Sequence, residues 1–305
     1  MFIVKYRKIW YVLSGLFVAT SLFAIFAFGL KPGIDFTGGS LLEVEYSEGS
    51  RPHVSDVEAG LKELNIGQPL IRLSGDNGFI IRAKDLNESE YLSVMSNLSS
   101  FGESKEIRFD SIGPVIGKEL REKSWITILL VILMIMFYIA FTFRKVSVGA
   151  GKNGNVSSFK YGLVAVIALA HDVIIPAGVF AVLGKYLGVE IDILFITALL
   201  TVLGFSVNDT IVTFDRIREN LSVEKGKSFE EIVGLSIKQT LTRSINTSLT
   251  IVIVLLAIYF FAGESTKYFA LALLVGIVAG TYSSIFLASP LLVTVKRAFT
   301  KVRPS

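Results

Sequence analysis

An aspartate stands inside one of the long apolar segments of the sequence. Residues 193–214 are long and apolar enough to span a membrane, and Asp209 lies within them, roughly 8 Å from the nearer end at a rise of 1.5 Å per residue. An ionisable side chain at this depth is costly and usually faces a protein interior or water. Asp209, with Asn208 and Thr210 beside it, therefore predicts a group that binds and releases a proton. The alternative is a static ion pair with a nearby arginine.

A second group of polar residues opens the next apolar segment, residues 244–263. The stretch TRSINTSLT places Arg243 and Thr247 on one face of a helix, with Ser244 and Asn246 beside them. We expect this end of the segment to lie at the same depth as Asp209. Two interpretations of Arg243 remain: it faces the polar site, or its long side chain only extends to the membrane surface.

A third polar group, His171 and Asp172, lies near the middle of the apolar segment 161–184. Together with Asn246 and Thr247, this pair is a possible secondary polar site. The alternative is a buried, hydrogen-bonded pair that only holds helices together.

Composition excludes several kinds of chemistry. The 305 residues contain no cysteine, so disulfides and thiol nucleophiles are absent, and the two histidines, His53 and His171, are far apart in the chain. We therefore expect neither enzyme activity nor a cofactor, a metal or a nucleic-acid partner. With 52% hydrophobic and 18% charged residues, the sequence is typical of an integral membrane protein.

Six segments have the length and apolar character of membrane-spanning helices. They are residues 9–30, 124–143, 161–184, 193–214, 244–263 and 268–295. Basic residues concentrate at the two ends of the chain and after the second and fourth segments, which predicts that both termini are cytoplasmic. In the last segment, Gly276 and Gly280 form a G-x-x-x-G pattern, which predicts close packing of helices.

These segments divide the chain into three parts. The N-terminus and first span occupy residues 1–30, an exterior domain occupies 31–123, and five further spans occupy 124–305. In the last part, Ser228 and Glu231 fit a capping box, and the pattern after them predicts a short amphipathic helix on the cytoplasmic face near residues 228–242.

The exterior segment alternates strand and helix patterns in the order βαββαβ, with a DNG turn at residues 76–78 that predicts a hairpin. This is the order of a ferredoxin-like sandwich. The expected fold class is therefore a six-span helical membrane protein with one small α+β exterior domain, which fits a binding or packing module better than an enzyme. The stretch GIDFTGG leads into this domain, and its glycines, Gly33, Gly38 and Gly39, suit tight turns with positive φ.

Five motifs together resemble one known family. They are GIDFTGG after the first span, HD in the third, GFSVNDTIVTFDRIREN closing the fourth, TRSINTS opening the fifth and GTYSSIF in the sixth. The motifs and the layout cover nearly the whole chain. They resemble the SecF family, which supplies a membrane subunit of the bacterial SecD/SecF protein-export complex and belongs to the resistance-nodulation-division superfamily. The small exterior domain is similar to that of SecF rather than the larger one typical of SecD.

The resemblance implies a protein of the bacterial cytoplasmic (inner) membrane with a SecD partner that supplies six further spans. It also implies an encounter with the SecY-containing translocase channel and with a translocating unfolded polypeptide. The proton gradient would promote late-stage translocation, with Asp209 as proton carrier, Arg243 as its charge partner, and Asn208 and Thr210 along the path.

Two other classes remain open. One is a half-transporter subunit of a proton-driven solute exporter, and the other is a non-transporting scaffold of the translocon. A neighbouring gene for SecD would count against the solute exporter. Tolerance of a neutral residue at Asp209 would favour the scaffold.

Overall fold

The computed structural model describes residues 2–64, 66–143, 158–224 and 226–301, and the chain divides into two compact units. The helical unit comprises Met1–Lys31, Ile126–Val189 and Leu194–Ser305. The sheet unit comprises Pro32–Trp125 together with the distant segment Glu190–Ile193. The sequence analysis did not predict that this second segment belongs with the exterior domain.

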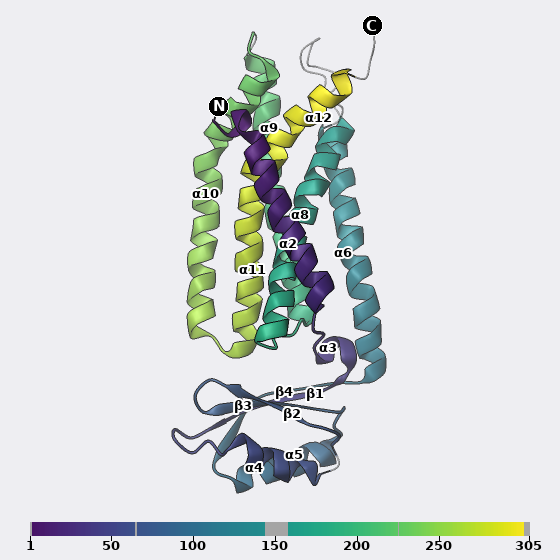
Figure 1. The fold of residues 1–305 in the computed structure, drawn as a ribbon, viewed down its shortest axis with the longest axis vertical. Coiled ribbons are helices and arrows are strands. Elements are labelled where there is room, and N and C mark those ends of the chain that lie inside the picture. The colour runs from purple at the N-terminus through teal and green to yellow at the C-terminus, as the bar shows by residue number, and fades with distance from the viewer. Residues whose placement is uncertain (1, 65, 144–157, 225, 302–305) are drawn as a thin grey trace. The chain divides into compact units, whose positions relative to one another are not determined.

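Six helices of the described residues are long and apolar enough to cross a membrane, which confirms the predicted number of spans. They run side by side in Figure 1. The helices outside the sheet unit's core are α1 (Phe2–Lys5), α2 (Arg7–Phe28), α6 (Pro114–Thr142), α8 (Ser158–Tyr186), α9 (Ile193–Val223), α10 (Phe229–Phe261), α11 (Glu264–Tyr282) and α12 (Ser289–Lys301), with a π-helical turn, η2 (Ser283–Ala288), between the last two. The sixth spanning helix is the continuous run of α11, η2 and α12.

Glycines allow the inner helices of this unit to approach closely. A Cβ atom on Gly276 of α11 would lie 2.3 Å from Val202 Cγ2 of α9, and one on Gly178 of α8 would lie 2.3 Å from Ser21 Cβ of α2. Real side chains do not tolerate such distances, so glycine is required where these helices cross. The spans α8, α9 and α11–α12 are more buried within the chain than α2, α6 and α10.

The helix α10 differs from its predicted form. Its capping box is present, because Ser228 Oγ accepts from the Glu231 N–H and the Glu231 carboxylate accepts from the Ser228 N–H. However, the expected amphipathic helix near residues 228–242 and the fifth span form one uninterrupted helix. The connecting sequence KQTLTRS contains neither glycine nor proline, so nothing in it ends the helix.

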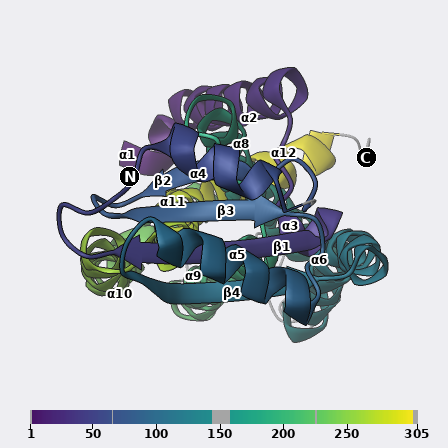
Figure 2. The ribbon, with the colours of Figure 1, turned by 90° about the horizontal axis from the view of Figure 1, so that it is seen from below.

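The sheet unit contains one four-stranded antiparallel sheet in the order β2-β3-β1-β4. Its elements are α3 (Ile34–Thr37), β1 (Gly39–Tyr46), α4 (Val54–Lys62), β2 (Leu70–Ser74), β3 (Gly78–Ala83), α5 (Glu88–Ser100) and β4 (Ser104–Ile112), which include the predicted order βαββαβ and the predicted hairpin. In Figure 2, α4 and α5 lie across one face of the sheet. Alternate strand residues such as Val44, Phe79 and Ile81 fill the core beneath these helices.

The GIDFTGG stretch forms α3 and the start of β1. Gly38 and Gly39 have φ angles of 75° and 124°, as predicted, and a Cβ atom on Gly38 would lie 2.7 Å from Pro114 Cα at the start of α6. The prediction of positive φ was wrong for Gly33, whose φ is −80°. Gly33 is instead needed for a close approach, because a Cβ atom there would lie 3.0 Å from the carbonyl oxygen of Ile191.

Candidate functional site

Asp209 lies on the buried face of α9. The residue is only 6% exposed, and its Oδ1 accepts a hydrogen bond of 3.0 Å from Ser244 Oγ on α10. Its Oδ2 is buried and has no hydrogen-bond partner among the described residues. An unsatisfied carboxylate oxygen in such a place is costly, and binding a proton relieves part of that cost. Oδ2 is therefore the atom of this group at which a proton can be held.

Hydroxyl groups surround Asp209. Thr210 Oγ1 lies 2.9 Å from Ser284 Oγ of η2, and Thr213 Oγ1 lies 3.3 Å from Thr240 Oγ1 of α10. All four of these side chains are buried. Because a hydroxyl both donates and accepts, this lining can pass or orient a proton without carrying a charge of its own.

The structure divides the residues predicted around Asp209 into two groups. Thr210 is buried, as Asp209 is. Asn208 is exposed on α9, and Arg243 is exposed on α10. Among the described residues, no ion pair joins Arg243 to Asp209; the side chain that reaches the carboxylate is that of the next residue, Ser244. Within this chain alone, Asp209 therefore hydrogen-bonds to a hydroxyl group, and the charge of Arg243 acts on it only from beyond ion-pair distance.

The buried polar face of α10 is different from the predicted one. Asn246 and Thr247 are exposed, and Thr247 Oγ1 donates to the Arg243 carbonyl of its own helix at 2.9 Å. The face that turns inward carries small hydroxyl residues, namely Ser236, Thr240, Ser244 and Ser248. Their spacing of four residues was the signal that would have identified them.

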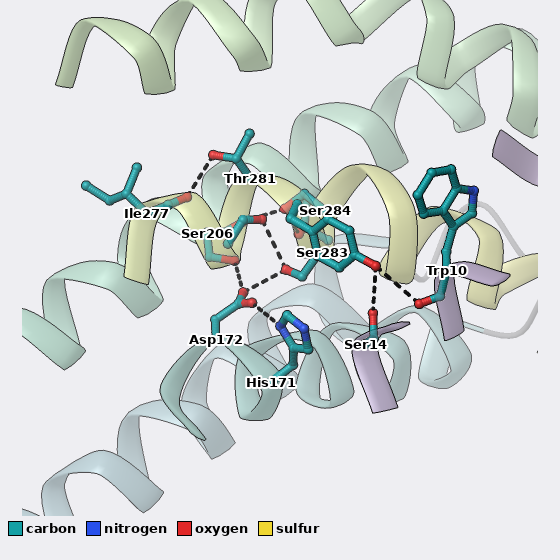
Figure 3. Close-up of polar contacts among 12 residues, drawn as sticks. Trp10, Ser14, His171, Asp172, Ser206, Ile277, Thr281, Ser283 and Ser284 are labelled. Carbon is teal, nitrogen blue, oxygen red and sulfur yellow. Dashed lines mark hydrogen bonds and ion pairs between the residues drawn. The ribbon is translucent and has the colours of Figure 1, made fainter. Parts of the chain in front are cut away.

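His171 and Asp172 of α8 form a second buried site, at the centre of Figure 3. Asp172 is fully buried, and its Oδ1 lies 2.8 Å from His171 Nδ1. Its Oδ2 accepts hydrogen bonds from Ser206 Oγ of α9 and, at 2.8 Å, from Ser283 Oγ of η2. Asp172 is thus well satisfied, unlike Asp209. The structure does not bring Asn246 or Thr247 into hydrogen bonding with this pair.

The histidine side of this site leads towards α2. The His171 ring stacks on the Tyr282 ring with centroids 5.9 Å apart, and its Nε2 is buried without a hydrogen-bond partner among the residues described. Tyr282 in turn donates to the Trp10 carbonyl and accepts from Ser14 Oγ, each at 3.2 Å. Helices α9 and α11 and the π turn therefore all contact one buried His–Asp pair.

The π-helical turn connects the two carboxylate sites. Ser284 Oγ lies 2.9 Å from Thr210 Oγ1, beside Asp209, and 3.4 Å from the carbonyl oxygen of Ser206, whose hydroxyl binds Asp172. Both Ser283 and Ser284 are turned inward by this irregular segment. Such π-helical turns often occur at functional sites. The SSIF part of the GTYSSIF motif marked these serines, but not their π-helical geometry.

Gly280 has a role at this junction beyond helix packing. A Cβ atom on Gly280 would lie 3.0 Å from Ser206 Cβ and 3.5 Å from Asp172 Oδ2. Any larger residue would therefore press on the hydroxyl that binds Asp172. In the part of the chain that the structure describes, no cluster of three or more His, Cys, Asp or Glu side chains could hold a metal ion.

Comparison with known proteins identifies relatives of this chain. Residues 93–298 match the family described as "Protein export membrane protein SecD/SecF, C-terminal", and residues 23–49 match the SecD/SecF GG motif. The protein translocase subunit SecF of Thermobaculum terrenum is 45% identical over 96% of this chain and 93% of its own length. The SecF of Anaerolinea thermophila is 39% identical over 94% and 91%, respectively.

Solved structures agree with these matches. The crystal structure of SecDF from Thermus thermophilus, described as a translocon-associated membrane protein, superposes with a TM-score of 0.80 at 32% identity over 96% of this chain. A second SecDF structure, in a super-membrane-facing form, gives a TM-score of 0.65 at 31% identity over 98% of this chain. The present chain spans 38% of the length of each of these solved chains.

Proposed function

The chain belongs to the SecF family of protein-export membrane proteins, and from that premise we propose that it is a proton-driven subunit of a protein-export complex in the bacterial inner membrane. In this proposal it acts with a SecD subunit and the SecY-containing channel. The complex uses the proton gradient to promote the late stage of translocation of an unfolded polypeptide.

The observation that carries the proposal is the state of Asp209. Its Oδ2 is buried without a hydrogen-bond partner among the described residues, on a helix otherwise suited to a membrane interior. A purely structural aspartate would be expected to satisfy both oxygens, as Asp172 does. We propose that Asp209 binds the proton at Oδ2 and that Thr210 and Ser284 extend the path towards the His171–Asp172 site.

The exposed polar residues of α10 support a partner subunit. Arg243, Asn246 and Thr247 are not covered by this chain, and polar side chains at membrane depth must meet protein or water rather than lipid. SecDF relatives are single chains more than twice as long, which leaves room for a partner with further helices. We propose that the SecD subunit covers this face and that Arg243 balances the charge of Asp209 in the assembled complex, with Asn208 along the proton path.

The charge distribution supports an orientation. Basic residues concentrate at both ends of the chain and after the second and fourth spans, so we propose that both termini are cytoplasmic. Residues 31–123 are then extracytoplasmic, on the side where an exported polypeptide emerges.

The test is export into inner-membrane vesicles that lack this chain and vesicles to which it has been restored together with a SecD subunit. We expect the proton gradient to accelerate the completion of translocation only in the restored vesicles. Equal stimulation in both would contradict the proposal. Transport of a small solute, without any effect on protein export, would favour the solute-exporter alternative.

A further inference from the structure

The connection between α8 and α9 is built into the sheet unit. Ile191 forms a parallel bridge with Pro32, and its carbonyl oxygen accepts a hydrogen bond of 2.7 Å from the Gly33 N–H. Two residues later, the Ile193 N–H donates to Asp35 Oδ2 at 2.7 Å. The first glycine and the aspartate of the GIDFTGG motif thus hold a segment that is more than 150 residues away in the sequence.

A buried carboxylate strengthens this attachment. The Glu190 side chain, which is 5% exposed, forms ion pairs with Arg72 of β2, at 3.3 Å, and with Arg82 of β3. Sheet register places both arginines on the same face, because Arg72 pairs with Ile80 and Leu70 pairs with Arg82. This is the face opposite to the core residues Phe79 and Ile81. Two neighbouring strands, rather than a loop, therefore fix the positions of both guanidinium groups.

Glu190, Arg72 and Arg82 together form a charged clamp, and their charges influence one another. Burial and the nearby charge of Arg72 lower the pKa of Arg82 to about 10, while Asp192 and Asp35 act in the opposite direction. Arg82 therefore remains charged at neutral pH, beside a second guanidinium. Removal of the Glu190 charge would leave two like charges close together and partly buried, which is a strongly unfavourable arrangement.

The clamp holds the connection between α8 and α9, the two helices that carry the buried aspartates. α8 ends at Tyr186 and carries Asp172, and α9 begins at Ile193 and carries Asp209. Only a short connection joins these helices, and residues 190–193 of that connection belong to the sheet unit. Because α9 begins at Ile193, the last residue of the segment that belongs to the sheet unit, a shift of α9 acts directly on the clamped segment.

We propose that Glu190, Arg72 and Arg82 are positioning residues that transmit proton-driven movement of α8 and α9 to the sheet unit. This inference rests on the proposed function, because it requires gradient-driven export. It assigns a specific role to the Gly33 and Asp35 positions of the GIDFTGG motif, which hold the backbone of the connection while Glu190 holds the sheet. It also predicts that the clamp remains closed during the transport cycle.

The first test replaces the carboxylate with its neutral isostere. Glu190→Gln keeps the shape of the side chain but removes its charge, and Glu48→Gln, at an exposed position of the same unit, is the matched control. At equal protein levels, we expect Glu190→Gln to lose most of the gradient stimulation of export, while the rate without a gradient and assembly with SecD stay unchanged. A lower thermal stability is expected in either case, but a purely structural role would leave the ratio of the two rates, at equal protein levels, as in the wild type.

The second test is a charge exchange within the clamp. Glu190→Arg and Arg82→Glu each place like charges together and should abolish gradient stimulation, whereas the double variant restores two opposite pairs and should recover part of it. Wild-type stimulation in Glu190→Gln, or no recovery in a stably assembled double variant, would overturn the inference. Absence of gradient stimulation in the wild type would instead refute the proposed function.

Discussion

The two buried aspartates of this protein differ in how completely they are hydrogen-bonded. Asp172 receives donors from His171, Ser206 and Ser283, so its charge is distributed over several partners. Asp209 receives a side-chain donor from Ser244 on one oxygen, and its other oxygen is unsatisfied among the described residues. This difference assigns proton exchange to Asp209 and a holding role to Asp172 within the proposal.

Replacement of Ser244 by alanine tests the environment of Asp209 at the scale of one hydroxyl. Ser244→Ala removes the hydroxyl that donates to Asp209. The loss costs about 1–3 kcal/mol, because a buried group is left unsatisfied. We expect the variant to assemble but to show reduced gradient stimulation of export. The control is Ser222→Ala, because Ser222 is exposed near the end of α9 and its hydroxyl donates to the Glu219 carbonyl of its own helix. Equal effects of the two substitutions would contradict a specific role for Ser244.

Sequence reasoning located the important carboxylates but not all of their partners. Asp209 and the His171–Asp172 pair stood out because ionisable residues are rare in apolar segments. Ser244 was placed beside the face of Arg243 and Thr247, so the four-residue spacing of hydroxyl residues that marks the inward face of α10 was missed. Arg243 is its neighbour in the sequence, and the two side chains point to different faces of α10.

At the scale of helices, the tighter of two glycine contacts between α11 and α9 is that of Gly276. The space that a Gly276 side chain would need is occupied by Val202, whose branched side chain cannot move aside as a flexible chain end would. We expect Gly276→Ala to destabilise the purified protein by about 1–3 kcal/mol through overpacking. The midpoint of thermal unfolding in detergent measures this effect.

A compensating substitution and a control make this prediction specific. Val202→Ala should recover much of the loss when it is combined with Gly276→Ala, because it empties the space that the new methyl group enters. Gly15→Ala in α2 is the control, since a Cβ atom there would meet nothing within 4 Å. Independent, additive effects of the two substitutions would show that this contact does not set the distance between α9 and α11.

Local sequence patterns predicted which helices and strands exist. They did not predict the continuity of α10 or the π-helical turn. Apolar runs predicted the six spans, and the DNG turn predicted the β2–β3 hairpin. The continuity of α10 across residues 228–261 was missed because a change from amphipathic to fully apolar sequence resembles a boundary. The π turn at Ser283–Ala288 was also missed, because no glycine or proline within these residues marks a change in the helix.

At the scale of the whole molecule, the orientation can be tested with introduced cysteines, because the chain has none of its own. Ser47→Cys, at an exposed position of the sheet unit, should react with a membrane-impermeant maleimide in cells whose inner membrane is intact. Ser222→Cys, at the end of α9, should react only after permeabilisation. The reverse pattern would invert the topology and would place the sheet unit away from the emerging polypeptide.

The organisation into units was predictable only where it follows the chain. A domain was predicted at residues 31–123, whereas the sheet unit also includes residues 190–193, where Glu190 pairs with two arginines that are far from it in the sequence. One glutamate in a short loop has many possible partners in a sequence with 30 basic residues, so pairing of this kind requires the structure.

The most direct measurement of the proposed role of Asp209 as proton carrier compares two aspartate-to-asparagine substitutions on α9. Asp209→Asn keeps the size and hydrogen-bonding ability of the buried side chain but cannot ionise, whereas Asp215→Asn changes an exposed surface partner of Arg218. Late-stage export into membrane vesicles is followed with and without a proton gradient, at matched levels of the assembled complex. We expect the Asp209→Asn complex to assemble normally but to lose gradient stimulation, and the Asp215→Asn complex to behave as the wild type. Wild-type gradient stimulation in the assembled Asp209→Asn complex would contradict the role of Asp209 as proton carrier.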